Sequence, residues 1–336
     1  MEKSLDRKLA NIHAHPTTAK DFILADAKDA DMAFGLSAPG RRLEPSDGPG
    51  RFCSLAEYRD HMREIIHQGL VDILLMSTSS SEILTIEERL FDNSSVTPAA
   101  RANDTTDIHL VRGGRYSQVP SIPFRTPTID QMQCGKAVCT PEERKLGCNL
   151  GLYSVTFNND PECDHRTLKA YREFRNEAEQ KGFRHFLEVF DPNVPGAVEP
   201  ETLGHFMNDH IARLLAGVPR SSRPIFLKIA YHGPQFMEEL AAYDPHLVPG
   251  ILGGSSGTTF DAFKLLAEAK KYGARAALFG RKINHSEHQL TFVQFLRWIA
   301  DGEITAEEAV RGYHGALQKL GIKPIRPLEK DMELTS

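Results

Sequence analysis

The chain of 336 residues is long enough to bury a large hydrophobic core, either as one large α/β domain or as two smaller ones. Its 40 Lys and Arg residues against 45 Asp and Glu residues give a formal net charge of -5, and no long block of like charge stands out. This balance argues against a protein that binds nucleic acid or a membrane surface.

The N-terminus and the cysteines indicate the cellular compartment in which the protein is expected. Residues 1–9 are charged and lack the apolar stretch of a signal peptide, and no stretch reaches about 18 apolar residues, so we expect a cytoplasmic protein. The five cysteines are odd in number and scattered, and Cys134 and Cys139 lack the spacing of a zinc ribbon. Free thiols are therefore the expected state.

The first strand is predicted at 22–25, a short apolar run that ends at Asp26. A long connection rich in Gly and Pro follows it. Ser54 is a suitable N-cap for a helix whose apolar residues recur at helical spacing and which ends at Gly69. The apolar run 70–76 is then the second strand.

The signals are weakest in the region 83–149. Here the sequence predicts a short helical piece at 84–90 and the third strand at 108–112, so the third unit carries insertions. Clearer strands follow at 150–157 and 185–190, and each is succeeded by an amphipathic helix that ends at a glycine.

The second half of the chain continues the alternation. The sixth strand is predicted at 225–229, the seventh at 247–252 and the eighth at 276–279, and two amphipathic helices at 290–299 and 306–320 follow.

About eight strand-then-helix units with short buried strands are typical of a (β/α)8 barrel, although a doubly wound sheet has a similar order of strands and helices. No Gly-x-Gly-x-x-Gly motif follows the first strand, which disfavours a dinucleotide fold. We expect one barrel domain over residues 1–336, with its core at about 20–320 and insertions after strands 1 to 3.

Lys228 is the one charged residue in the otherwise apolar run 224–230. Burying an ammonium group without a partner is costly, and desolvation lowers the pKa of a lysine amine until the amine can attack a carbonyl. The alternative is a lysine at the end of a strand whose side chain extends to water.

In a (β/α)8 barrel the active-site groups lie at the carboxyl ends of the strands. On this strand assignment those ends carry, in chain order, Asp26, Arg112, Tyr153 or the asparagines that follow its strand, Glu188, Lys228, Gly253-Gly254-Ser255 and Gly280-Arg281. The last two groups are glycine-rich turns in adjacent units, whose backbone N–H groups can bind a phosphate while Arg281 adds a charge-assisted contact. The alternative is that the glycines only make tight turns between strand and helix.

Five stretches of the chain resemble the class I (Schiff-base-forming) aldolase family, in particular its divergent bacterial and archaeal branch that acts on phosphorylated ketoses. They are Phe22–Asp26, Phe186–Glu188, Ile225–Lys228, Ile251–Ser255 and Leu278–Arg281. The resemblance spans most of the chain, from the first strand to the eighth, although each motif is short.

The resemblance implies a lyase of carbohydrate metabolism in which Lys228 attacks the ketone of a sugar phosphate. The resulting iminium then serves as the electron sink for the adjacent C–C bond. Glu188 shuttles protons during this step, and Asp26 takes or returns a proton near the bond. Arg112 and Arg281 hold the phosphate and help to keep Lys228 neutral. The mechanism needs no metal and no cofactor.

The fourth strand departs from the family pattern. Many class I aldolases have a second lysine at its end, whereas this chain has Tyr153, which would supply the acid–base group as a tyrosine does in the divergent branch. Barrel aldolases of this type often assemble, and the amphipathic helices at the end of the chain offer a surface for a homo-oligomer.

Two other functions fit parts of the sequence. His13-Ala-His15 resembles the His-x-His motif of metal-dependent barrel hydrolases, but the residues before it form only a weak strand pattern. The second is a barrel that binds a phosphorylated sugar, as an isomerase or a non-catalytic sensor. In that protein Lys228 would only form a salt bridge with Glu188.

Overall fold

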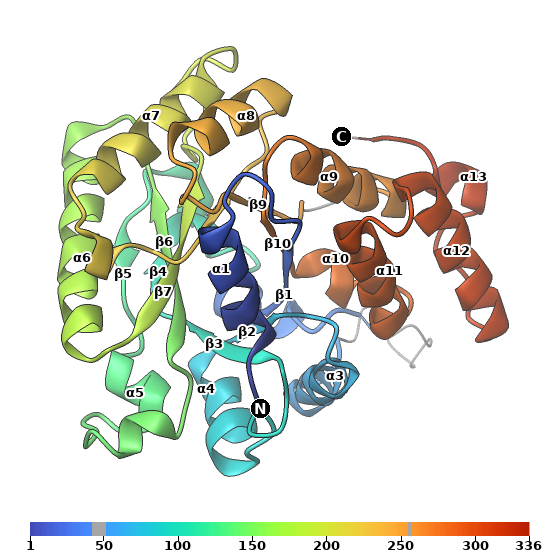
Figure 1. Cartoon of the computed structure of the whole chain (residues 1–336), viewed down its shortest axis with the longest axis horizontal. Helices are drawn as coiled ribbons and strands as arrows, with labels where there is room; N and C mark the ends of the chain where they lie inside the picture. The colour runs from blue at the N-terminus through green and yellow to red at the C-terminus, as the bar shows by residue number, and fades with distance from the viewer. Residues whose placement is uncertain (42–51, 255–256, 336) are drawn as a thin grey trace.

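The computed structural model describes residues 1–41, 52–254 and 257–335. Eight strands close into a barrel in the order β1, β2, β3, β6, β7, β8, β9, β10, with β10 adjoining β1 (Figure 1). Every neighbouring pair in this barrel is parallel, and helices run between the strands. The predicted (β/α)8 fold is confirmed, and the doubly wound sheet is excluded.

The barrel strands are short, as the sequence predicts. They are β1 (Ile23–Lys28), β2 (Ile73–Met76), β3 (Thr97–Arg101), β6 (Leu150–Thr156), β7 (Arg184–Phe190), β8 (Leu227–Ile229), β9 (Gly250–Leu252) and β10 (Ala276–Phe279). A two-stranded antiparallel ribbon of β4 (Asp104–Thr105) and β5 (Pro123–Phe124) lies in the connection after β3.

The predicted third strand is wrong. The run 108–112 lies in a largely exposed connection, and the third barrel strand is β3 instead. Proline and alanine have low strand propensity, so the sequence Thr-Pro-Ala-Ala-Arg of β3 gives almost no strand signal. Its pairing with β2 and β6 on both sides makes it a strand.

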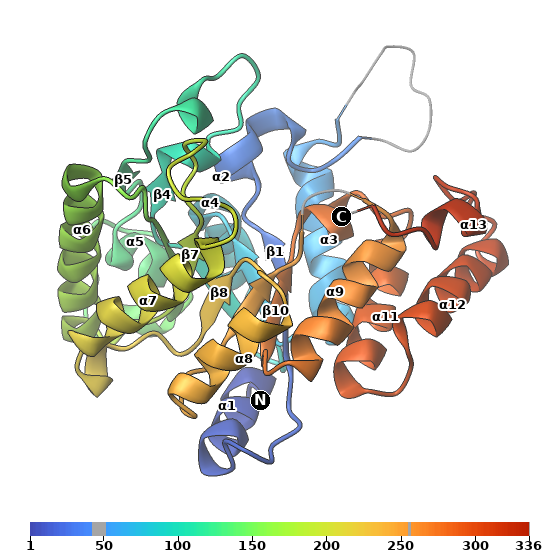
Figure 2. The same ribbon diagram turned by 90° about the horizontal axis from the view of Figure 1, so that it is seen from above.

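The helices surround the barrel (Figures 1 and 2). Their bounds are α1 (Ser4–Ala14), α2 (Asp31–Phe34), α3 (Leu55–Gln68), α4 (Thr78–Ser81), α5 (Ile129–Cys134), α6 (Pro161–Gln180), α7 (Leu203–Ala216), α8 (Pro234–Tyr243), α9 (Thr259–Lys271), α10 (Arg281–Asn284), α11 (Gln289–Asp301), α12 (Ala306–Lys319) and α13 (Leu328–Asp331). Helix α3 begins with the predicted Ser54 cap, which forms a capping box, and ends at Gly69 with a left-handed φ of 69°. None of the helices in the described part of the chain has the length and apolar character needed to cross a bilayer.

The apolar residues of the strands divide into an inner and an outer cluster. In β1, Ile23 and Ala25 belong to the cluster inside the barrel, whereas Leu24 packs in the layer between strands and helices. This alternation decides which side chains of a strand can reach a site inside the barrel.

Helix α1 closes the amino-terminal end of the barrel. Its residues Leu5, Leu9 and Ile12 join the inner cluster, and Figure 2 shows α1 at the opposite end of the barrel from α2. The weak strand expected before His13 is therefore a helix. Because His13 and His15 lie at the end of α1, the His-x-His motif is at the wrong end of the barrel for a hydrolase site formed by strand ends.

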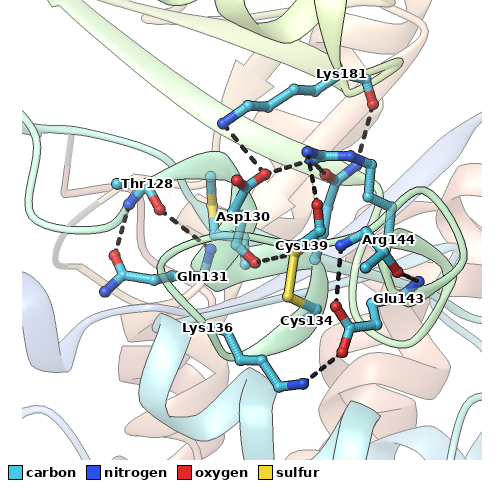
Figure 3. Close-up of a disulfide and its surroundings, with 12 residues drawn as sticks. Thr128, Asp130, Gln131, Cys134, Lys136, Cys139, Glu143, Arg144 and Lys181 are labelled. Atoms are coloured by element: carbon cyan, nitrogen blue, oxygen red, sulfur yellow. Dashed lines mark hydrogen bonds and ion pairs between the residues drawn. A yellow bond between two sulfur atoms is a disulfide. The ribbon is translucent and has the colours of Figure 1, made fainter.

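A disulfide joins Cys134 to Cys139, so the expectation of free thiols is wrong for this pair. The two residues lie at the end of α5, in the connection between β3 and β6 (Figure 3). Close by, Asp130 forms ion pairs with Arg144 and Lys181. A spacing of five residues in sequence gives no signal for pairing, because the fold of the intervening turn decides whether the two sulfurs meet.

Candidate active site

A cavity of about 430 Å³ opens at the carboxyl ends of the barrel strands. Its lining includes six of the predicted site residues, which are Lys228, Glu188, Gly253, Gly254, Gly280 and Arg281. Asp29 and Arg101 line it as well, although the sequence did not single them out. Ser255, the remaining residue of the seventh-strand turn, lies outside the described residues.

Lys228 and Glu188 meet inside the barrel. They are register partners on the adjacent strands β8 and β7. Both point inward, because the residues two positions earlier, Phe186 on β7 and Phe226 directly before β8, belong to the inner cluster. The Nζ of Lys228 lies 2.6 Å from Oε1 of Glu188, and both side chains are buried. The amine therefore has a proton acceptor in direct contact.

The second carboxylate oxygen of Glu188 extends this pair into a chain of polar contacts. Oε2 accepts a 2.6 Å hydrogen bond from the hydroxyl of Ser154 on β6 and lies 3.4 Å from Nη2 of Arg101 on β3. Arg101 also donates from Nε to Oδ2 of Asp29 at 2.6 Å and from Nη1 to Ser154 Oγ at 3.1 Å. Burial acts to lower the pKa of Arg101, but the carboxylates of Asp29 and Glu188 outweigh it and raise that pKa.

Asn103 fixes the place of Ser154 in this chain. Its side-chain oxygen accepts from the Ser154 backbone N–H at 2.6 Å, and its side-chain nitrogen donates to the Ser154 carbonyl at 2.8 Å. The site thus holds one amine, two carboxylates, one guanidinium and one hydroxyl in a connected set. Such a set can move protons to and from a group that reacts at Lys228.

The predicted base Asp26 is not in the cavity. It shares the outward face of β1 with Leu24, so its carboxylate lies between the barrel wall and the helices, fully buried. There Oδ2 is 3.2 Å from Nζ of Lys28. Burial raises the pKa of Asp26 to about 6, an effect that Lys28 opposes. The acid that reaches the cavity from this segment is Asp29, three residues later.

The predicted phosphate ligand Arg112 is also misplaced. It lies in an exposed turn of the connection after β3, where its guanidinium is 5.8 Å from the ring centre of Phe52. The arginine that the third strand brings into the site is Arg101, at the end of β3. The error follows directly from the wrong third strand.

Tyr153, the predicted acid–base group of the fourth strand, faces outward. Its ring stacks on Phe174 of α6 with centroids 4.5 Å apart, and burial raises the pKa of its hydroxyl. The next residue, Ser154, takes the inward position. The sequence offered a usable signal here, because a polar residue between Tyr153 and Val155 in an apolar strand is a candidate for the inner face.

The glycine turns of the seventh and eighth strands come close to the neighbouring backbone. A Cβ atom at Gly253 would lie 2.3 Å from the ring of Phe279, and one at Gly280 would lie 2.7 Å from the carbonyl oxygen of Ala27. Close packing at the barrel rim therefore requires glycine at both positions.

Arg281 borders the cavity. Its guanidinium lies 5.5 Å from the ring centre of Phe34 and forms no hydrogen bond or ion pair with any described residue. Burial lowers the pKa of Arg281, and no acid among the described residues offsets this effect. A half-buried cation with unused donors is suited to an anionic ligand.

The start of α9 is already occupied by the C-terminal segment. The backbone N–H of Thr259 donates to Oδ1 of buried Asp331 at 2.8 Å, and Thr258 and Asp261 form a capping box. Nζ of Lys282 donates to the carbonyls of Gly257 and Thr258 at 2.7 and 2.9 Å. An anion at this rim therefore depends on the glycine turns and Arg281 rather than on the first N–H groups of α9.

Neither a protein-family model nor the sequence of a curated protein matches this chain. Solved structures do match it in fold. A Schiff-base-forming fructose-1,6-bisphosphate aldolase matches with a TM-score of 0.60 at 13% identity, over 87% of this chain and 99% of that chain.

An archaeal fructose 1,6-bisphosphate aldolase matches with a TM-score of 0.58 at 13% identity, over 88% of this chain and 99% of that chain. The protein Cgl0159 from Corynebacterium glutamicum also gives 0.58, at 14% identity, over 90% of this chain and 99% of that chain. At these identities the likeness shows the fold. The chain is a (β/α)8 barrel similar to those of Schiff-base aldolases.

Proposed function

We propose that this protein is a class I aldolase, a carbon–carbon lyase that cleaves or forms a phosphorylated ketose through a Schiff base on Lys228. The observation that carries the proposal is the buried Lys228–Glu188 contact of 2.6 Å at the bottom of a cavity formed by strand ends. The fold shared with Schiff-base aldolases and the resemblance of the strand motifs support it.

The first step is condensation of the amine with the ketone. Lys228 attacks in its neutral form, so its ammonium proton first passes to Oε1 of Glu188, which is in direct contact. The same carboxyl returns the proton to the carbinolamine hydroxyl, which leaves as water and gives the iminium. Ser154 and Arg101 hold the other oxygen of Glu188 and so fix the direction of proton transfer.

The second step breaks the C–C bond next to the iminium. The electron pair of that bond moves onto the iminium and forms an enamine, while the neighbouring hydroxyl loses its proton and becomes the carbonyl of the leaving aldehyde. Because Asp26 faces away from the cavity, we assign this proton transfer to Asp29, whose carboxylate lines the cavity beside Arg101.

The phosphate is assigned to the rim of the seventh and eighth strands. The half-buried Arg281 supports this assignment because it has no acidic partner among the described residues. The backbone of Gly253, Gly254 and Gly280 lies next to it at the cavity wall, where N–H groups complement a phosphate.

The test is reduction of the Schiff base. Protein is incubated with dihydroxyacetone phosphate and then with borohydride, and the intact mass is measured. We expect one covalent adduct on the wild-type protein and none on Lys228→Met. A wild-type protein that gains no adduct with this or related ketose phosphates contradicts the aldolase function.

A second candidate function is a phosphosugar-binding barrel, either an isomerase or a non-catalytic protein. The 2.6 Å contact of Lys228 with Glu188 also fits a salt bridge that only supports the site. In that case phosphosugars bind, with binding measured by calorimetry, but borohydride traps no adduct.

A further inference from the structure

We propose that the ketose phosphate handled at Lys228 has an apolar aldehyde-derived half, an aliphatic or aromatic group in place of a hydroxylated sugar chain. This inference rests on the proposed aldolase function and specifies its substrate class. It follows from the way the polar and apolar groups are distributed over the cavity wall.

The charged side chains that line the described part of the cavity are gathered in two places. Asp29, Arg101, Glu188 and Lys228 form one connected group at the bottom, and Arg281 stands alone at the rim. These two places account for the reacting carbonyl and for one anionic group of the substrate.

The remaining large side chains of the described wall are apolar, with one exception. The apolar ones are Phe34, Ile108, Leu110, Phe190, Leu252, Leu265 and Leu278. The exception, Tyr231, donates its hydroxyl to Glu268 at 3.0 Å. A sugar chain would bring several hydroxyls against this wall, and each one buried without a partner weakens binding.

Two enlarged connections supply the outer part of this wall. Phe34 lies on the short helix α2 after β1, and Ile108 and Leu110 lie in the inserted connection after β3. Leu110 is 42% exposed, so it contributes little to the core and is available to what enters the cavity. These residues are therefore placed to determine specificity.

Space for an apolar group continues beyond Phe34. A second cavity of about 340 Å³ shares Ala30, Phe34 and Arg281 with the first. Its other side chains are apolar Ala38, Phe52 and Ile325 and polar Ser37, Arg41 and His285. Arg281 and Phe34, whose guanidinium and ring lie 5.5 Å apart, line both cavities. A group longer than that of a triose has room on this side.

The reaction balances without a further reactant. In the direction of synthesis, the enamine carbon formed from dihydroxyacetone phosphate attacks the carbonyl carbon of the aldehyde, and the aldehyde oxygen takes one proton. Water then hydrolyses the iminium, which frees the amine of Lys228 and releases the new ketose phosphate.

The experiment keeps dihydroxyacetone phosphate as the donor and varies the acceptor. Aldol formation is measured with hexanal, with phenylacetaldehyde and with glyceraldehyde 3-phosphate. We expect kcat/KM to be at least about tenfold higher for the two apolar acceptors, since burial of an apolar group of this size is worth that factor or more.

A matched pair of variants locates the effect. Leu110→Ser should lower the ratio of kcat/KM for the apolar acceptors to kcat/KM for glyceraldehyde 3-phosphate by about threefold to tenfold. Val111→Ser is the control, because Val111 is the next residue and is 44% exposed but does not line the cavity. Equal thermal unfolding temperatures of the two variants exclude a folding effect.

The outcomes separate this inference from the proposed function. If borohydride traps the donor but glyceraldehyde 3-phosphate is the better acceptor, the inference is overturned and the aldolase function stands. The same holds if Leu110→Ser changes all acceptors equally. If no donor adduct forms, both fail together.

Discussion

Two lysines are buried among the described residues, and each has an acid beside it. Lys228 lies inside the barrel, with Nζ 2.6 Å from Glu188, and faces the cavity. Lys28 lies on the outer face of β1, with Nζ 3.2 Å from Asp26 and 2.7 Å from Oε1 of Gln289, and it is fully enclosed.

The two lysines differ in whether a substrate can reach the amine. Burial lowers the pKa of Lys28, so desolvation alone does not mark a nucleophile. The amine of Lys28 is surrounded by protein groups, including Asn284 and the ring of Tyr58. Only Lys228 combines burial, an acid in contact and an open space for a substrate. We therefore propose a structural role for the Asp26–Lys28 pair and a role in the proposed reaction for the Glu188–Lys228 pair.

The largest expected effect is on turnover in Lys228→Met. We expect aldol cleavage to fall below detection, because no other amine lines the cavity within the described residues. The free energy of unfolding should change little, since Glu188 retains Ser154 and Arg101 as partners. Initial rates and urea unfolding measure the two quantities, and surviving turnover contradicts the assignment.

Glu188→Gln keeps the shape of the site but removes its proton acceptor. We expect kcat to fall by about 10²–10⁴ while KM changes little, as for loss of a general acid–base group. Steady-state kinetics test this prediction. An unchanged kcat shows that another group, with Asp29 as the nearest candidate, performs the proton transfer.

Lys28→Met should act on stability and leave the chemistry intact. It leaves the buried carboxylate of Asp26 without its countercharge, which costs about 3–5 kcal/mol of unfolding free energy. The double variant Asp26→Leu/Lys28→Met should recover most of this loss. Turnover per folded molecule should stay at the wild-type value in both, and a loss of turnover places Asp26–Lys28 in the reaction after all.

The smallest expected effect concerns a third lysine, whose contribution to the free energy of unfolding depends on pH. Lys282 is half-buried at the rim, and burial lowers its pKa from the usual 10.5 to about 8, while Asp261 and Asp331 raise it and Arg326 lowers it further. Between pH 8 and 10.5 the unfolded chain binds more protons at this lysine, so its contribution to stability rises with pH in that window.

Comparison with Lys282→Met isolates this contribution. The wild-type free energy of unfolding minus that of the variant should increase from pH 8 to pH 10 and be flat below pH 7. Urea unfolding at each pH measures it. A constant difference across the whole range shows that the folded-state pKa of Lys282 is not lowered.

Most of the fold follows from the sequence, because buried strands and amphipathic helices alternate with clear glycine and capping signals. The third strand does not, since Pro98 and two alanines in β3 hide it and only its neighbours define it. The disulfide of Cys134 and Cys139 and the docking of Asp331 on α9 depend on tertiary contacts that no local pattern encodes.

The site was predictable where a charge interrupts an apolar run, as at Lys228 and Glu188. The site residues were not predictable where the prediction depended on which face of a strand points into the barrel. Strands buried on both faces carry apolar residues on both, so the sequence does not tell whether Asp26 or Tyr153 points inward. Tyr153 and the next residue, Ser154, lie on opposite faces of the same strand, and Ser154 is the one that contacts Glu188.

The most direct test of the central claim is the location of the reduced Schiff base. Wild-type protein is treated with dihydroxyacetone phosphate and borohydride, digested, and its lysine-containing peptides are sequenced by mass spectrometry. The account predicts the label on Lys228 and none on Lys28, although both amines are buried beside an acid. A label on Lys28 or on any other lysine, or no label at all, contradicts it.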